Sequence, residues 1–196
     1  MRAAAKYVIA VAISTGIMFG QQQKLNEMPE IVTVCEVLGN LSKYADTDVA
    51  VVGRMGRSVS LVDQYESLSQ DRCGHPLITH GHTFPNRIEI ITKWEDGMPK
   101  PPGDRPRLDN ARIAAKLSQV RRTTELGFHT EPRFNEKGKT VEVIVPNEWA
   151  FVYGRLVKTP RLSEDCGAKG CGGDDVPLVI VAKEQEVRTL AGGDVR

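Results

Sequence analysis

The sequence predicts a single, mostly β domain: a small barrel with the element order strand-strand-strand-helix-strand-strand, preceded by a short helix. Three strand-like segments rich in β-branched residues precede one amphipathic helical segment, and two or three such segments follow it. A chain of 196 residues, 40% of them hydrophobic, is long enough to enclose one good core. We therefore expect one domain rather than two.

The short helix is predicted over residues 34–43. Thr33 and Glu36 form a capping box, in which the Thr33 hydroxyl accepts from a backbone amide and Glu36 reaches back to the cap. The apolar residues that follow recur at helical intervals; they are Val34, Val37, Leu38 and Leu41. We expect the Asp46-Thr47-Asp48 segment to end this helix.

The first three strands are predicted over residues 49–55, 58–63 and 87–94. The first is largely apolar and β-branched, and Gly56 separates it from the second, which alternates. The third has β-branched residues throughout its centre. Residues 64–86 lie between the second and third strands, and we expect them to be irregular.

One long helix is predicted over residues 108–122, after a proline-rich stretch at 99–106 that rules out regular structure. Its apolar face carries Ile113, Leu117 and Val120. Strands are then predicted over 140–145 and 149–157, and the last over 177–183, continuing through 186–190. This order of elements is that of an OB-fold-like small β-barrel (β-β-β-α-β-β).

Five sequence segments after residue 32 carry a resemblance to known proteins. They are Thr33-Val34-Cys35-Glu36-Val37-Leu38, Val51-Val52-Gly53-Arg54, Cys73-Gly74-His75-Pro76-Leu77-Ile78-Thr79, Phe84-Pro85-Asn86 and Val152-Tyr153-Gly154-Arg155-Leu156. In these segments the chain resembles a group of uncharacterised exported bacterial proteins with an OB-fold-like domain. The resemblance covers most of the chain after residue 32 and implies export and fold, but no activity. A proline-rich stretch at 99–106 and an extra strand near 140–145 depart from the group's pattern.

Residues 1–20 have the three-part pattern of a secretory signal peptide. Arg2 and Lys6 give a positive start, an uncharged apolar run follows from Tyr7 to Phe19, and Gly20 is small enough to precede a cleavage site. We therefore expect a periplasmic or secreted protein with a flexible leader at 21–32 and one OB-like domain at 33–192. The alternative is that residues 7–19 stay in place as an N-terminal membrane anchor.

The four cysteines predict disulfide bonds, because their number is even and the protein is expected to be exported. Three pairings are possible among Cys35, Cys73, Cys166 and Cys171. Cys166 and Cys171 enclose a short loop with two glycines, which closes without backbone strain, so we favour that pair. Cys35 with Cys73 then follows by elimination.

The charge balance of 26 basic against 25 acidic side chains gives no reason to expect a nucleic-acid partner. Residues 100–122 carry a local charge of +5, which we interpret as a solvated helix face. On an OB-like barrel, the loops near 55–60 and 158–176 usually frame the ligand site. We expect an anionic ligand or another envelope protein there, bound by basic residues at those positions: Arg54, Arg57, Arg155 and Lys158.

A histidine cluster offers an alternative function as a metal-binding protein or metal-dependent enzyme. Its candidate ligands are His75, His80 and His82, which follow Cys73 in one segment. Their spacing matches no standard ligand pattern, and a disulfide-bonded Cys73 could not ligate. We expect His80 and His82 to point the same way if the segment is extended.

Enzyme chemistry finds little support in the sequence. There is no Gly-x-Ser-x-Gly elbow, and no glycine-rich phosphate loop is followed by Lys-Ser/Thr. We therefore predict no cofactor, and we favour an exported OB-like binding or structural module of unknown ligand over an enzyme.

Overall fold

The computed structural model describes residues 28–59, 64–93, 99–103, 107–124, 127–159 and 176–190. The predicted signal peptide and the Cys166 and Cys171 pair lie outside these residues. The helices described are α1 (Val34–Leu38), α2 (Leu41–Tyr44) and α3 (Asn110–Thr123). The strands described are β1 (Ile31–Thr33), β2 (Asp48–Val59), β3 (Gln64–Ser69), β4 (Ile78–Thr79), β5 (His82–Thr83), β6 (Arg87–Ile91), β7 (Phe128–Phe134), β8 (Thr140–Pro146), β9 (Glu148–Lys158) and β10 (Leu178–Leu190).

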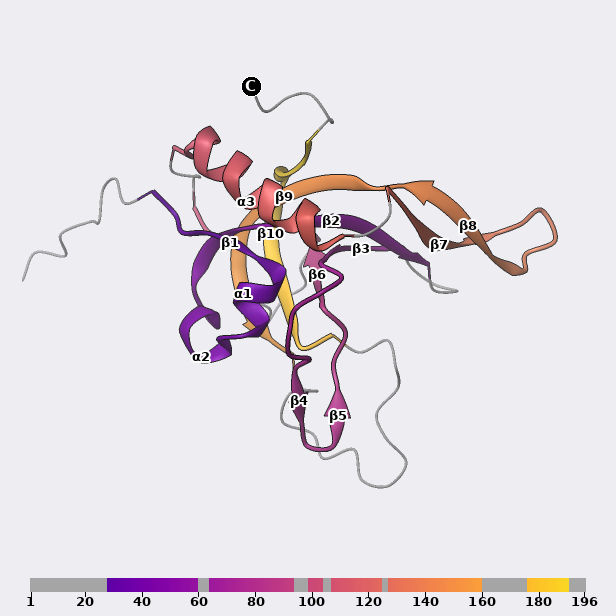
Figure 1. The fold of residues 1–196 in the computed structure, drawn as a ribbon, viewed down its shortest axis with the longest axis horizontal. Helices are drawn as coiled ribbons and strands as arrows, with labels where there is room; N and C mark the ends of the chain where they lie inside the picture. Colours follow the sequence, from indigo (N-terminus) through magenta and orange to yellow (C-terminus); the bar gives the residue numbers. More distant parts are fainter. Residues whose placement is uncertain are drawn as a thin grey trace, which may run out of the picture.

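Five strands close into a barrel, in the order β2-β3-β6-β10-β9 and back to β2 (Figure 1). β6 and β10 pair in parallel, and the other four pairings are antiparallel. With α3 between the third and fourth barrel strands, the predicted mostly β, OB-like small barrel is confirmed. β1 adds to the open edge of β2 in parallel, beside the barrel.

The interior of the barrel is filled by the inward-facing residues of all five strands, because successive side chains of a strand point to opposite faces. From β2, for example, Val49, Val51 and Met55 join the buried core. Val34 and Val37 of α1 belong to the same core, so this short helix packs against the barrel interior. The predicted capping box holds it: Glu36 N donates to Thr33 Oγ1 over 3.2 Å, and Thr33 N donates to Glu36 Oε2 over 2.8 Å.

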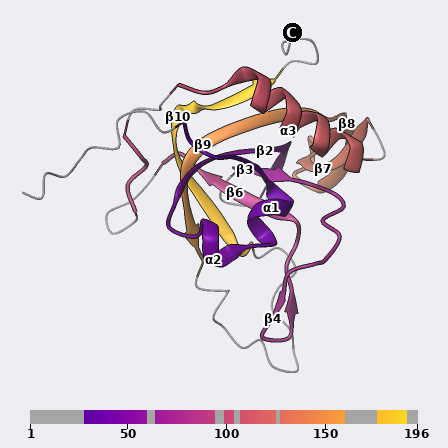
Figure 2. The ribbon, with the colours of Figure 1, turned by 60° about the vertical axis from the view of Figure 1, so that its left-hand side comes forward.

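α3 lies across the outside of the barrel (Figure 2), and a second apolar layer lies between the helix and the strands. The three residues predicted for the buried face of this helix, Ile113, Leu117 and Val120, are all buried. They pack with outward-facing residues of β1, β2 and β9, among them Ile31, Val52 and Phe151. Asp109 caps the helix by accepting from the backbone amides of Ala111 and Arg112.

The structure corrects several predicted boundaries near the N-terminus. The predicted flexible leader ends in β1, where Ile31 and Val32 are buried beside β2. The predicted single helix over 34–43 is two helices, because the Asn40 side chain accepts from Lys43 N and starts a new turn. The Asn40 side chain therefore competes with a continuous helix.

The strand predicted over 58–63 does not start as a separate element, because residues 58–59 belong to β2; residues 60–63 lie outside the described residues. β2 runs through Gly56 to Val59, and its partner β3 begins at Gln64, inside the segment that we predicted to be irregular. Gly56 stays in the ladder because it pairs with Ser67 of β3. Tertiary pairing therefore outweighs the local effect of the glycine.

No helix among the described residues is long and apolar enough to span a membrane.

Candidate functional site: a groove between the barrel and a hairpin

β7 and β8, which lie between α3 and β9 in the sequence, form a β-hairpin that projects from the barrel (Figure 1). Its tip is a turn in which Asn135 Oδ1 accepts from the backbone amides of Lys137 and Lys139. Gly138 has a φ of 69°, a left-handed conformation that glycine adopts without strain. β8 covers the strand predicted over 140–145, whereas β7 was not predicted.

The base of the hairpin is held by His129 of β7. Its Nδ1 lies 3.0 Å from Asn147 Oδ1, and its Nε2 lies 3.1 Å from Glu131 Oε1. The other oxygen of Glu131 accepts from Arg133 over 3.3 Å. Glu131 is buried, and both ring nitrogens of His129 have protein partners. His129 therefore positions the base of the hairpin.

The barrel faces the hairpin with an ion pair. Arg54 of β2 approaches both carboxylate oxygens of Asp71, over 2.8 and 3.0 Å, and its Nε donates to Ser69 Oγ over 3.3 Å. A bidentate pair of this kind fixes the orientation of the guanidinium plane. Arg72 follows Asp71 and is exposed.

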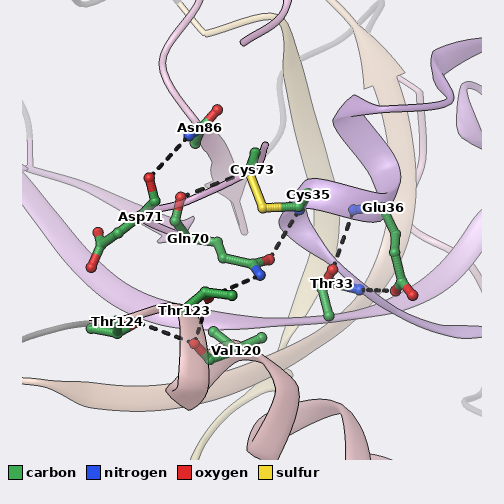
Figure 3. The surroundings of a disulfide bond; sticks show 10 residues. All are labelled: Thr33, Cys35, Glu36, Gln70, Asp71, Cys73, Asn86, Val120, Thr123 and Thr124. Carbon is green, nitrogen blue, oxygen red and sulfur yellow. Dashed lines mark hydrogen bonds between the residues drawn. A yellow bond between two sulfur atoms is a disulfide. The ribbon is translucent and has the colours of Figure 1, made fainter. Parts of the chain in front are cut away.

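The segment that carries Asp71 and Arg72 is fastened on two sides (Figure 3). Cys73 forms a disulfide bond with Cys35 of α1, with an S–S distance of 2.04 Å, so this predicted pairing is confirmed. On the other side, Asn86 Nδ2 donates to the backbone oxygen of Asp71 over 3.3 Å.

Gln70, which precedes this segment, is buried and connects three parts of the fold (Figure 3). Its Oε1 accepts from the backbone amide of Cys35 over 3.1 Å, and its Nε2 donates to Thr123 Oγ1 over 3.2 Å. Its backbone amide donates to the oxygen of Asn86 over 3.1 Å. The wall of the groove is therefore tied to α1, to α3 and to the start of β6.

Between the two walls lies a groove of about 470 Å³, which is within the size range of small-molecule sites. The hairpin contributes apolar surface: Phe128 is 58% exposed and Ile144 is 73% exposed. The barrel contributes charge and hydrogen-bond donors. The residues that line the groove are Arg54, Asp71, Arg72, Phe128, His129, Thr130 and Ile144.

The structure does not bring the four predicted ligand-binding residues together. Arg155 lies six residues along β9 from Trp149, which pairs with Arg54, so the two arginines are roughly 20 Å apart. Arg155 forms a bidentate pair with Asp48 over 2.7 and 3.0 Å, and this bond raises the pKa of its guanidinium. Lys158 is exposed at the end of β9, beyond Arg155.

Arg57 lies on β2 three residues after Arg54, outside the groove. It approaches the carboxylates of Glu66 and Glu148 only to 4.0 and 3.9 Å. Of the four predicted basic residues, only Arg54 lines the groove, and its charge is balanced there by Asp71.

The histidine cluster does not form a metal centre among the described residues, where no group of three or more His, Cys, Asp or Glu side chains could hold a metal ion. His80 lies in the turn between β4 and β5, with a φ of 48°, and not in an extended segment. His82 is buried, with its ring edge-to-face against Phe84 at 4.2 Å, whereas His75 and His80 are exposed. Cys73 is disulfide-bonded and cannot ligate as a thiolate.

The helical part of the basic segment over 100–122 lies largely on the solvated face of α3, as expected, whereas residues 104–106 lie outside the described residues. Lys116 of α3 forms an ion pair with Glu36 of α1, and Arg121 lies over the ring of Trp149 at 5.6 Å. Arg112 and Arg122 are exposed. Lys116 and Arg121 therefore join α3 to α1 and to β9.

The apolar wall of the groove was not predicted from the sequence. Ile144 was placed in a strand, but nothing in its pattern shows that it faces solvent. Phe128 lies in a segment of mixed composition, Phe-His-Thr-Glu-Pro-Arg-Phe, which has no simple alternation. Searches with protein-family models, among curated proteins and among solved structures found no match to this chain.

Proposed function

We propose that this protein is an exported OB-like binding module, and that the groove between the barrel and the hairpin is its ligand site. One observation carries this proposal: two large apolar side chains, Phe128 and Ile144, are left exposed opposite the Arg54–Asp71 ion pair. Concave sites that combine apolar surface with a few fixed polar groups are typical of ligand binding.

The chemistry of the walls favours a ligand with an apolar body and one anionic group. Phe128 and Ile144 offer area for apolar contact. A guanidinium has five N–H donors, and Ser69 and Asp71 accept from three of those of Arg54. The remaining donors can reach ligand oxygens, while Asp71 keeps the guanidinium in place. An acyl chain with a carboxylate has this chemistry, as does the C-terminal end of an apolar peptide.

Export is supported by the pattern of residues 1–20 and by the Cys35–Cys73 disulfide bond, since structural disulfides persist in oxidising compartments. The expected intact mass of the protein recovered from the periplasm or medium corresponds to a start near Gln21. A mass that includes residues 1–20 would show instead that this segment is retained.

The groove can be tested with anilinonaphthalene sulfonate, a fluorescent probe that has an apolar body and one sulfonate. We expect saturable binding to one site on the native protein. Replacing Ile144 by Ser removes apolar contact area and should weaken the binding by about tenfold. Arg54→Met should also weaken it, because the sulfonate loses a cationic partner.

Phe134→Ser is the matched control. Phe134 is an exposed aromatic residue on the same face of the same hairpin, but it does not line the groove. Its replacement should leave the dissociation constant of the probe unchanged. If Phe134→Ser and Ile144→Ser weaken the probe equally, the groove is not the site.

A further inference from the structure

The outer edge of β8 has no partner strand among the described residues. Two hydrogen bonds show which of its backbone groups point outward. Asn135 N donates to Lys139 O over 2.9 Å at the tip of the hairpin, and Asn147 N donates to Gly127 O over 2.8 Å at its base. Hydrogen-bonded and non-hydrogen-bonded pairs alternate along an antiparallel ladder. The odd-numbered residues of β8 therefore bond to β7, and the amides and carbonyls of Thr140, Glu142 and Ile144 point away from it.

The two edges of the hairpin are not equivalent. Pro132 of β7 stands opposite Glu142 in a non-hydrogen-bonded pair, so its nitrogen faces the outer edge of β7 and has no proton to donate. β7 also lies beside β2. β8 has no proline before Pro146 and, within the described residues, pairs with β7 alone. An edge of this kind is a template for strand addition.

The sequence of β8 is nearly symmetric about Val143: Val141-Glu142-Val143-Ile144-Val145. Two such strands can pair antiparallel with Val143 opposite Val143. Val141 of each copy then stands opposite Val145 of the other, and β-branched residues in directly opposed pairs stabilise a sheet. In this register Glu142 stands opposite Ile144, so no like charges meet.

The adjacent permitted registers are worse. In a permitted register, the outward-pointing, even-numbered residues of one copy must face even-numbered residues of the other copy. Neighbouring permitted registers therefore differ by a shift of two residues. One step in one direction sets the two Glu142 carboxylates directly opposite each other, which is destabilising. One step in the other direction sets Val141 opposite Asn147 and leaves two valine pairs in place of three. It also sets Glu142 opposite Pro146, which has no N–H to donate. The pattern thus selects the register with Val143 at the centre.

We propose that β8 pairs antiparallel with β8 of a second copy of this chain, with Val143 on the two-fold axis. The two hairpins then form one four-stranded sheet. Thr140, Glu142 and Ile144 of both copies lie on the same face of that sheet, so the apolar groove walls of the two copies become neighbours. A seven-residue edge buries less surface than a standard interface, so the dimer is weak and depends on concentration.

Sedimentation equilibrium of the full chain is the first test, with substitutions at one position. Glu142→Pro removes an outward N–H without removing a bond to β7, and it should leave the protein monomeric at concentrations where the wild type is dimeric. Glu142→Thr is the matched control, because it keeps that N–H and should keep the dimer. Circular dichroism of each variant shows whether the fold is retained.

A cysteine test reads the register and does not depend on the proline variant. Directly opposed residues in a non-hydrogen-bonded pair have Cα atoms about 4.5 Å apart, within the range of disulfide bonds. Val143→Cys should therefore give a covalent dimer on oxidation, whereas Val141→Cys, which faces Val145, should give little. A wild-type protein that stays monomeric at every concentration overturns the proposal. Equal crosslinking through Val141→Cys also overturns it.

Discussion

Two Gly-Arg pairs show how single residues shape the barrel. Gly53-Arg54 lies on β2, and Gly154-Arg155 lies on β9. Each glycine is buried and each arginine pairs on the outside with an aspartate, Asp71 or Asp48. Both motifs are visible in the sequence, but the role of the glycines is seen only in the structure. They allow neighbouring strands to approach closely.

Gly154 is the tighter of the two positions. A Cβ atom there would lie 2.6 Å from the Val181 oxygen and 2.7 Å from Ile180 Cγ1, so β9 and β10 would have to separate. We expect Gly154→Ala to lower the free energy of unfolding by about 1–3 kcal/mol. Urea denaturation measures this change.

Gly103→Ala is the control for that substitution. Nothing lies within 4 Å of a Cβ at Gly103, and its φ is not in the left-handed region. Its effect should stay within about 0.5 kcal/mol. Equal stability of Gly154→Ala and the wild type would show that β9 and β10 are not packed as closely as described.

At the scale of elements, the disulfide bond and Gln70 fix one wall of the groove. The Cys35–Cys73 bond closes a loop with a sequence separation of 38 residues, for which the chain-entropy model gives about 4 kcal/mol of stabilisation. It also holds the residues next to Asp71 and Arg72. Stability and groove geometry should therefore depend on the same bond.

Replacing Cys35 and Cys73 together by Ala should lower the free energy of unfolding by about 3–4 kcal/mol. The same variant, where still folded, should bind the groove probe more weakly than the wild type, because the segment carrying Asp71 loses a tether. Ser118→Ala, on the exposed face of α3, is the control and should change neither quantity. Unchanged probe binding in the double variant would show that the geometry of the groove does not depend on the disulfide bond.

The elements differ in how well the sequence predicted them, for physical reasons. α1 and α3 were predictable because the capping box and the Ile113, Leu117 and Val120 spacing are local signals. The boundary between β2 and β3 was not, because Gly56 is kept in its strand by partners from β3. β7 has no apolar alternation, since His129 and Glu131 form a buried polar contact there. Its identity as a strand depends on β8.

In the whole protein, the order of elements along the chain was predictable, but the site was not. That order led to the barrel. The loop predicted near residues 55–60, from which Arg54 was selected, belongs to β2 as far as Val59. Whether an arginine is available for a ligand depends on its partners. Those of Arg54 and Arg155 lie 17 and 107 residues away in the sequence. No local pattern predicts such pairs.

The location of the ligand site determines which residues of the protein take part in binding. Three locations can be distinguished: the groove, the end of the barrel near Asp48, Arg155 and Lys158, and the β4–β5 hairpin with His80 and His82. Arg54 and Arg155 are roughly 20 Å apart. The β4–β5 hairpin and the β7–β8 hairpin project from the barrel in different directions (Figure 1). A method that reports on every backbone amide can therefore separate them.

The most direct measurement is a two-dimensional ¹H–¹⁵N NMR titration of the protein with anilinonaphthalene sulfonate. If the ligand binds in the groove, the largest amide shifts occur in residues 54, 71–72, 128–130 and 144. Amides near Asp48 and Arg155, and those of the β4–β5 hairpin, should stay in place. Shifts that cluster around Arg155 and Lys158, or around His80 and His82, would show that the ligand site lies outside the groove.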